Sequence, residues 1–372
     1  MKIGLVNKFY PPIIGGIEYH IRTLAEMLEK YAEVEKIEIL VANSIYKTEK
    51  EKISEKIYIT RVSNLKTVAS TPIAPALIRE LRHLDVDIVH FHFPYPFGDF
   101  SWLCSFCEKP YIITYHSDIL RQKYLNYLYA PIRNKFFSKA KRVLATSPNI
   151  CQESSVLQRF ANKISIVPLG ISPGKYFDEK NIIQGALIKK RFKRPIVLFV
   201  GRFVYYKGVD ILIKASRNLD IDLIMIGKGP LLEDLQQMVL MYGIADKVHF
   251  YSNVNDDELV AYFLACDMFV LPSIANTEAY GLVQLEAHAA GKPVISTNLP
   301  TGVPFVNKHM ETGLIVEPKD ILGLKNAMKL LAEDSGLRQI LGENAQKRML
   351  KEFTDVKMVQ RVYDIYFDIL KK

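Results

Sequence analysis

The feature that most restricts the fold of this chain is a repeated alternation between short apolar runs and amphipathic helical stretches. Residues 2–6 (KIGLV) form an apolar run, for example, and residues 21–30 (IRTLAEMLEK) follow with helical periodicity. Parallel strands need long crossover connections, and strands buried on both faces are apolar throughout. The alternation therefore predicts a doubly wound α/β fold. The expected strands lie at 2–6, 37–42, 57–62, 87–92, 111–116, 142–147 and 164–169, and then at 195–201, 222–227, 247–251, 267–272 and 293–297.

The chain is expected to divide at a segment rich in proline and glycine. Residues 168–178 (PLGISPGKYFD) interrupt the alternation, which is typical of a linker. A single hydrophobic core rarely serves a chain of 372 residues. We therefore expect two Rossmann-like domains, at 1–170 and 171–353, facing each other across a cleft. The amphipathic stretch 354–372 is expected to form a helix that packs back on the first domain.

The sequence shows no membrane span, secretion signal or zinc motif. No apolar run approaches the length of a transmembrane helix, and Met1 leads directly into a strand-like segment. We therefore expect a cytoplasmic protein. Four cysteines are too few for a disulfide scaffold, and the CxxC of Cys104 and Cys107 has no second pair to complete a zinc site. We expect no bound metal.

The formal net charge of +9 is concentrated in the first half, where residues 1–185 carry 25 Lys and Arg against 18 Asp and Glu. Residues 118–142 hold seven basic side chains and one acidic one, interleaved with aromatic residues. Such a helix suits an anionic membrane surface, which is the partner we expect for this segment. A solvated helix face is an equal alternative, and nucleic acid is disfavoured because no recognition motif accompanies the charge. The aromatic residues are Tyr124, Tyr127, Tyr129, Phe136 and Phe137.

Ligands of doubly wound sheets bind beyond the carboxyl ends of the strands, so the loops that follow the predicted strands are the candidate site. After the first strand, Gly15 and Gly16 open a helix whose free N–H groups favour an anion, although a tight turn explains the pair equally well. After the fifth strand, His116 can hydrogen-bond a substrate or accept a proton near neutral pH. We expect His90 and His92 to be structural, with His92 as a candidate lining residue.

The first strand of the second half leads into GRFVYYKG, which places Arg202 and Lys207 in one loop. A forked guanidinium and an ammonium group at the same strand end can clamp a diphosphate without a metal ion. Two surface cations beside a turn are the alternative. The clamp is favoured because Arg202 directly follows a buried strand, where its side chain is expected to point into the cleft.

The segment 271–297 (LPSIANTEAYGLVQLEAHAAGKPVIST) is the most specific of these signals. Glu278 lies in the loop after a strand, and Glu286 lies in the helix that follows. Each carboxylate can accept hydrogen bonds from adjacent hydroxyls of a sugar ring. A solvated helix face is disfavoured because alanines flank Glu286 on a tightly packed helix. Between the two glutamates, an anion can bind the backbone N–H groups of Gly281, Leu282 and Val283.

Taken together, these motifs resemble the retaining GT-B glycosyltransferases of family four over essentially the whole chain. The resemblance is carried by PPIIGGIEYHIRTLAEML, ITYHSD, GRFVYYKG and the two glutamates with seven residues between them. It implies an acceptor-binding first domain, a second domain that binds the nucleotide sugar, and no need for a metal. It also implies that Gly16 faces the donor diphosphate, His116 bonds the donor sugar, Arg202 and Lys207 hold the phosphates, Glu278 binds the transferred hexose, and Glu286 binds the ribose.

The sequence departs from the family pattern in a few places. The usual Glu-x-Phe-Gly has Tyr280 as its aromatic residue, and His288 stands where methionine is common. The loop 298–308 (NLPTGVPFVNK) lacks the usual glycine pair followed by an acid, so donor contacts from this loop are not carried over. The sequence is most similar to members that assemble lipopolysaccharide or capsule.

The reaction implied by the resemblance is transfer of a hexose from a GDP- or UDP-sugar to a hydroxyl of a lipid-linked saccharide, with retained configuration, at the inner face of the membrane. A front-face mechanism is favoured, because no carboxylate is obliged to act as a nucleophile. A sugar-nucleotide epimerase and a non-catalytic nucleotide-binding membrane protein are the alternatives. An epimerase needs no acceptor, whereas a non-catalytic protein would tolerate loss of Lys207 and Glu286.

Overall fold

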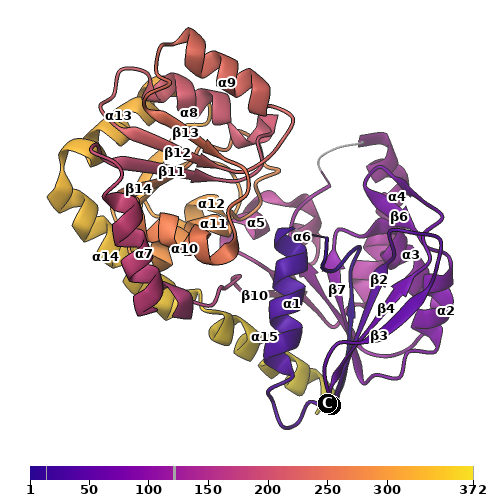
Figure 1. The fold of residues 1–372 in the computed structure, drawn as a ribbon. Helices are drawn as coiled ribbons and strands as arrows, with labels where there is room; N and C mark the ends of the chain where they lie inside the picture. Colours follow the sequence, from indigo (N-terminus) through magenta and orange to yellow (C-terminus); the bar gives the residue numbers. More distant parts are fainter. Residues whose placement is uncertain (14, 120–122, 372) are drawn as a thin grey trace. The chain divides into compact units, whose positions relative to one another are not determined.

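The computed structural model describes residues 1–13, 15–119 and 123–371. These residues form two compact units, one of Met1–Leu169 with Asp355–Lys372 and one of Gly170–Thr354. The sequence pattern places these boundaries at 170/171 and 353/354. Each unit is a three-layer arrangement in which helices cover both faces of a mostly parallel sheet (Figure 1). The doubly wound α/β architecture expected from the alternating pattern is confirmed.

The first unit contains an eight-stranded sheet in the order β10-β9-β8-β7-β1-β2-β4-β3. All neighbouring strands are parallel except the pair of β3 and β4. On one side of the sheet β2, β4 and β3 follow β1, and on the other side β8, β9 and β10 follow β7. The strand order therefore reverses between β1 and β7. The strands are β1 (Lys2–Val6), β2 (Lys36–Ala42), β3 (Glu49–Lys52), β4 (Ile57–Val62), β7 (Ile88–Phe93), β8 (Tyr111–Tyr115), β9 (Arg142–Ala145) and β10 (Ile164–Ile166).

The alternating pattern does not predict β3 or the small hairpin of β5 (Lys66–Val68) and β6 (Thr71–Ile73). The reason is visible in β3, whose sequence EKEK is charged and mostly exposed at the sheet edge. The helices of this unit are α1 (Gly16–Leu28), α2 (Ala76–Arg82), α3 (Pro96–Ser105), α4 (Lys123–Lys139), α5 (Pro148–Glu153), α6 (Ser155–Arg159) and α15 (Asp355–Leu370).

The C-terminal helix α15 packs against α1, as the amphipathic pattern predicts. The rings of Tyr31 and Tyr363 stack with centroids 4.3 Å apart, and the Tyr31 hydroxyl donates to Gln360 Oε1 at 2.8 Å. Deeper in the core, the hydroxyl of Tyr366 bonds His90 Nδ1 at 2.6 Å. The helix therefore belongs to the first unit, although 185 residues of the second unit precede it in the chain.

The second unit contains a fully parallel six-stranded sheet in the order β13-β12-β11-β14-β15-β16. Its strands are β11 (Ile196–Val200), β12 (Asp222–Ile226), β13 (Val248–Tyr251), β14 (Met268–Leu271), β15 (Val294–Thr297) and β16 (Gly313–Val316), of which β16 was not expected. Its helices are α7 (Glu179–Lys189), α8 (Val209–Ser216), α9 (Leu232–Met241), α10 (Asp256–Ala265), α11 (Val283–Ala289), α12 (Val303–Val306), α13 (Ile321–Glu333) and α14 (Ser335–Glu352). The order reverses between β11 and β14, which makes this strand pair the switch point.

The structure corrects the interpretation of segment 118–142 as a continuous basic and aromatic surface. Residues 120–122 lie outside the described residues. In α4, Tyr129, Phe136 and Phe137 are buried in the core, because helical spacing puts them on one inward face. Among the side chains of this helix that the structure describes, which exclude that of Tyr124, the exposed large apolar ones are instead Leu125, Tyr127 and Leu128. In the part of the chain that is described, no helix is both long and apolar enough to cross a membrane.

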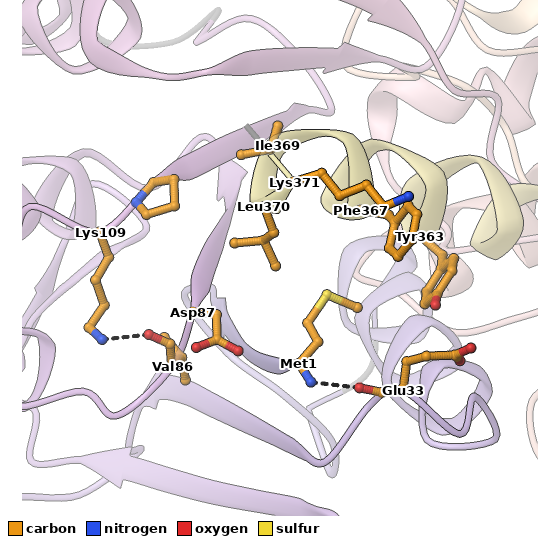
Figure 2. Close-up of a pocket in the computed structure, with 11 residues that line it drawn as sticks. Met1, Glu33, Val86, Asp87, Lys109, Tyr363, Phe367, Ile369, Leu370 and Lys371 are labelled. Atoms are coloured by element: carbon orange, nitrogen blue, oxygen red, sulfur yellow. Dashed lines mark hydrogen bonds between the residues drawn. The ribbon is translucent and has the colours of Figure 1, made fainter.

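A surface pocket of roughly 730 Å³ lies in the first unit (Figure 2). It is lined by residues just before β1, β7 and β8 and by the end of α15, including Met1, Asp87, Lys109 and Phe367. It therefore opens at the amino ends of the strands. Ligands of doubly wound sheets bind at the opposite edge, so this pocket is not the candidate active site.

Candidate functional site

The loops after β11 and β14 are in contact at the switch point of the second sheet. The N–H of Ile274 donates to the carbonyl of Tyr206 at 2.8 Å. Gly208 has a φ of 65°, and a Cβ at this position would lie 2.1 Å from the carbonyl oxygen of Pro272. Glycine adopts this left-handed conformation without strain, and because it has no Cβ it also allows this close approach. Backbone contacts thus join two motifs that lie far apart in the sequence.

The contact between these loops brings Lys207 and Glu278 together. Lys207 Nζ lies 2.5 Å from Glu278 Oε2, and each side chain is only 10% exposed. The hydroxyl of Ser273 donates to the same carboxylate oxygen at 2.8 Å, and Thr297 Oγ1 in turn donates to the Ser273 carbonyl at 2.5 Å. The cation expected at the phosphates and the carboxylate expected at the hexose therefore form one buried ion pair.

Arg202 takes a different position from the one its place in the sequence suggested. Its side chain is exposed, and Nη2 donates to the hydroxyl of Tyr206 at 3.1 Å. Strand β11 ends at Val200 and the chain bends at Gly201, so Arg202 no longer follows the direction of the buried strand. The tyrosine holds the guanidinium beside the loop that carries Lys207.

Glu286 lies on α11 and is partly buried. Burial raises the pKa of its carboxyl from 4.5 to about 7, and a hydrogen bond from the Tyr176 hydroxyl, at 3.4 Å from Oε1, opposes this shift. The chain enters α11 through Gly281, which has a φ of 71°. A Cβ on Gly281 would lie 2.6 Å from Leu271 Cδ2, and the positive φ strains any residue with a side chain, so glycine is favoured at this turn.

Further residues that the sequence motifs did not include complete this part of the site. The loop Gly227–Gly229, directly after β12, packs on the loop after β11, where the N–H of Phe203 donates to the carbonyl of Lys228 at 2.8 Å. A Cβ at Gly227 would lie 1.9 Å from the Gly201 carbonyl oxygen. The signal in the sequence is a pair of glycines directly after a strand. Ser273 and Tyr176 had no comparable signal, because their partners become apparent only in the folded structure.

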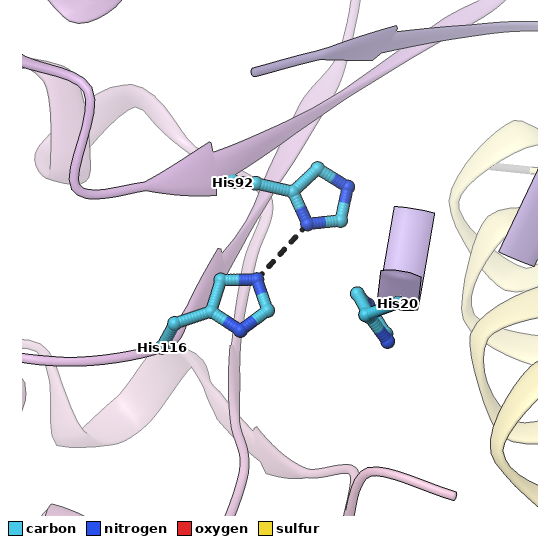
Figure 3. A group of neighbouring side chains, drawn as sticks. All are labelled: His20, His92 and His116. Carbon is cyan, nitrogen blue, oxygen red and sulfur yellow. Dashed lines mark hydrogen bonds between the residues drawn. The ribbon is translucent and has the colours of Figure 1, made fainter. Parts of the chain in front are cut away.

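In the first unit, His116 lies just past β8 and is buried. Its Nε2 lies 3.1 Å from His92 Nδ1, and the ring of His20 from α1 packs edge-on against both (Figure 3). His90 has the structural environment that we expected, since its nitrogens contact the hydroxyls of Tyr366 and Thr114, each at 2.6 Å. The candidate lining residue His92 thus lies directly beside His116.

The glycine pair at the start of α1 has a carboxylate close to it. Gly15 is the N-cap residue, Gly16 is the first helical residue, and a Cβ at Gly15 would lie 2.2 Å from Glu18 Oε2. Burial raises the pKa of Glu18. An external anion at this helix start would therefore meet the Glu18 side chain. The expected site residues fall into two groups, with Gly16 and His116 in the first unit and Arg202, Lys207, Glu278, Gly281, Leu282, Val283 and Glu286 in the second.

Two family models match most of the chain. The model described as Glycosyltransferase Family 4 matches residues 14–175, and the model described as Glycosyl transferases group 1 matches residues 184–348. The two matches correspond to the two units of the structure and contain all the candidate site residues.

Named relatives and solved structures agree with this assignment. D-rhamnosyltransferase WbpZ of Pseudomonas aeruginosa is 34% identical over 77% of this chain and 75% of its own length. O-antigen chain mannosyltransferase C of Escherichia coli is 28% identical over 100% of this chain and 99% of its own. Two solved structures share the fold. Sucrose-phosphate synthase of Thermosynechococcus elongatus has a TM-score of 0.81 at 22% identity, over 100% of this chain and 99% of its own. HepE of Anabaena, solved with UDP, has a TM-score of 0.78 at 18% identity, over 99% of this chain and 100% of its own. The chain is therefore a member of glycosyltransferase family 4 with the GT-B fold, an enzyme that transfers a sugar.

Proposed function

We propose that this glycosyltransferase transfers a hexose of manno configuration from a nucleoside diphosphate sugar to a hydroxyl of a saccharide acceptor in cell-surface polysaccharide synthesis. The relatives support the sugar, because one is named a mannosyltransferase and the other a D-rhamnosyltransferase, and D-rhamnose is 6-deoxy-D-mannose. The structure of HepE with UDP supports a nucleotide-bound donor. The observation that carries the proposal is the buried pair of Lys207 and Glu278 at the switch point of the second sheet.

The positive groups around this pair suit a diphosphate leaving group. Breaking the bond between the anomeric carbon and the phosphate oxygen leaves negative charge on the diphosphate, and fixed positive groups stabilise that charge. Lys207 supplies a buried ammonium group, and Arg202 supplies a guanidinium from the same loop. The backbone N–H groups of Gly281, Leu282 and Val283 add donors at the start of α11.

Glu278 and Glu286 have environments that suit sugar hydroxyls. The bonds from Lys207 and Ser273 both end on Oε2 of Glu278, so among the described residues Oε1 remains able to accept from a hexose hydroxyl. Glu286 would bind the ribose of the nucleotide. In the first unit, His116 would bond the transferred sugar. Gly16 would allow the diphosphate to approach α1, provided that the Glu18 side chain turns away from the helix start.

We infer that the configuration at the anomeric carbon is retained by a front-face reaction. The acceptor oxygen forms its bond to the anomeric carbon on the face that the leaving phosphate oxygen departs from. That phosphate oxygen keeps the electron pair of the broken bond and takes the acceptor proton. The contact with Lys207 supports this route over a glycosyl-enzyme intermediate, because an ion-paired Glu278 is a weak nucleophile.

Product analysis tests the proposal. The enzyme is incubated with GDP-mannose or UDP-glucose and a saccharide primer, and the new linkage is examined by NMR. We expect transfer from the manno-configured donor and an α-linkage. A β-linked product or a trapped glycosyl-enzyme adduct would contradict the retaining front-face route. Incubation with donor alone is the control, because an epimerase would change the sugar without an acceptor.

We also propose that the acceptor is lipid-linked and that the first unit contacts an anionic membrane. The exposed Leu125, Tyr127 and Leu128 of α4 offer apolar anchors, and exposed basic residues follow at Lys135, Lys139, Lys141 and Arg142. The protein would then act from the cytoplasmic face. In a flotation assay with vesicles that contain anionic lipid, the wild type should float with the vesicles, and a Tyr127→Ser/Leu128→Ser variant should not. Equal flotation with neutral vesicles would exclude a contribution of the basic residues through attraction to anionic lipid.

A further inference from the structure

Three buried histidines from separate elements meet in the first unit (Figure 3). His20 lies on α1, His92 lies on β7 and His116 follows β8, and their exposed fractions are 3%, 1% and 5%. The three ring centroids form a nearly equilateral triangle with sides of 5.2, 5.3 and 5.4 Å. One ring nitrogen from each residue lies within 4.8 Å of the other two.

The nitrogens of this cluster are poorly satisfied by the protein. Both ring nitrogens of His20 are buried, and within the described ranges neither has a hydrogen-bond partner. The Nε2 of His92 is also unpaired there, but it is not the nitrogen that faces His116. Buried polar atoms are nearly always paired, so such a group of unpaired nitrogens calls for an explanation. The neighbouring His90 differs, because both of its nitrogens contact hydroxyl groups at 2.6 Å.

The charge state of the cluster suits a metal ligand. Burial lowers the pKa of His20 to about 4 and holds the pKa values of His92 and His116 well below their usual range. All three imidazoles are therefore neutral at neutral pH, which is the form that binds a metal ion.

The spacing of the rings also fits one shared ion. Imidazole nitrogen binds zinc at about 2.0–2.1 Å in a tetrahedral arrangement, which places two ligand nitrogens about 3.3 Å apart and ring centroids about 5 Å apart. His92 Nδ1 and His116 Nε2 are 3.1 Å apart, and the centroid distances match. We propose that His20, His92 and His116 form a binding site for one divalent transition-metal ion of the zinc class.

Metal binding has a consequence for catalysis that rests on the proposed function. Coordination through His116 Nε2 would replace its contact with His92 and would fix in the metal site the residue proposed to bond the transferred sugar. A bound ion would therefore inhibit transfer. The site would act as an inhibitory metal site and would not assist the reaction.

The direct test is metal titration of the full-length protein after treatment with a chelator. Cobalt(II) should bind with a stoichiometry of one and give the intense visible absorption of a tetrahedral site, and zinc should abolish this absorption by displacement. His20→Ala, His92→Ala and His116→Ala should each weaken binding at least tenfold. His83→Ala, which removes an exposed histidine of the same unit, is the matched control and should bind like the wild type.

A folding measurement keeps the result interpretable if a buried substitution destabilises the protein. Zinc should raise the thermal midpoint of the wild type and of His83→Ala, and it should leave that of His20→Ala unchanged. The proposal would be overturned if the wild type did not bind the metal stoichiometrically. It would also be overturned if the His20→Ala and His92→Ala variants bound the metal as tightly as the wild type. Zinc binding without inhibition would leave the metal site intact and refute the donor role of His116. Transfer by a wild type that binds no zinc would refute the metal site and leave the proposed function intact.

Discussion

The buried pair of Lys207 and Glu278 allows a quantitative test of how the second unit is built. Each side chain is 10% exposed, and the charged atoms are 2.5 Å apart. Removing one partner of a buried ion pair leaves an uncompensated charge and costs about 3–5 kcal/mol. Lys207→Met would leave Glu278 with the Ser273 hydroxyl alone, and Glu278→Gln would leave a buried ammonium group. We expect each substitution to lower the unfolding free energy by about 3 kcal/mol or more.

The double variant Lys207→Met/Glu278→Gln should lose less unfolding free energy than the two single variants lose in sum, because it removes both charges together. We expect a coupling energy of about 2 kcal/mol, which lies within the range measured for contacting residues. The assay is urea unfolding of the four proteins in a double-mutant cycle. Lys214→Met is a matched control, because its pair with Asp210 is about one third exposed and should be worth less than about 1 kcal/mol.

Additive effects of Lys207→Met and Glu278→Gln would refute the reasoning, since they would mean that the two charges do not compensate each other. A small effect of both single substitutions would refute it as well. Transfer activity provides a separate result. All three variants should lose it, including the double variant, because restored stability does not restore the positive charge for the leaving diphosphate.

Further predictions concern individual residues of the second unit. Because burial raises the pKa of Glu286 to about 7, the native state holds this proton more tightly than the unfolded chain. Stability should therefore fall by up to about 3 kcal/mol as the pH rises from 4.5 through 7, and Glu286→Gln should remove this slope in unfolding experiments at several pH values. Donor KM should rise as the pH falls below 7 if the carboxylate binds the ribose, and a flat pH profile would contradict that role. Gly208→Ala should destabilise the protein by several kcal/mol, since its Cβ would clash with Pro272 O at a φ of 65°; a thermal midpoint equal to that of the wild type would exclude the predicted clash. Arg202→Ala should leave stability within about 0.5 kcal/mol because the side chain is exposed, yet it should raise donor KM, and unchanged steady-state kinetics would remove Arg202 from the phosphate site.

The sequence alone determined the class of fold and the loops that matter. Parallel strands buried on both faces are mostly apolar, so most parallel strands of the two sheets are readable as local runs. The ends of those runs are enough to identify the loops of Lys207 and Glu278 as candidates for ligand binding. The strand β3 was missed because its EKEK sequence is charged and pairs only at an exposed edge. The edge strand β16 was also missed, although its GLIV sequence is apolar.

Only the tertiary structure decided which of these residues meet. Lys207 and Glu278 are 71 residues apart, and their contact depends on β11 and β14 being neighbours and on Gly208 fitting against Pro272. The burial of Phe136 and Phe137, which the charge pattern had placed on a surface, was likewise decided by which face of α4 meets the sheet. Local patterns record what a single segment needs, namely a buried face or a tight turn. Contacts between distant segments depend on the strand order, which no single segment specifies.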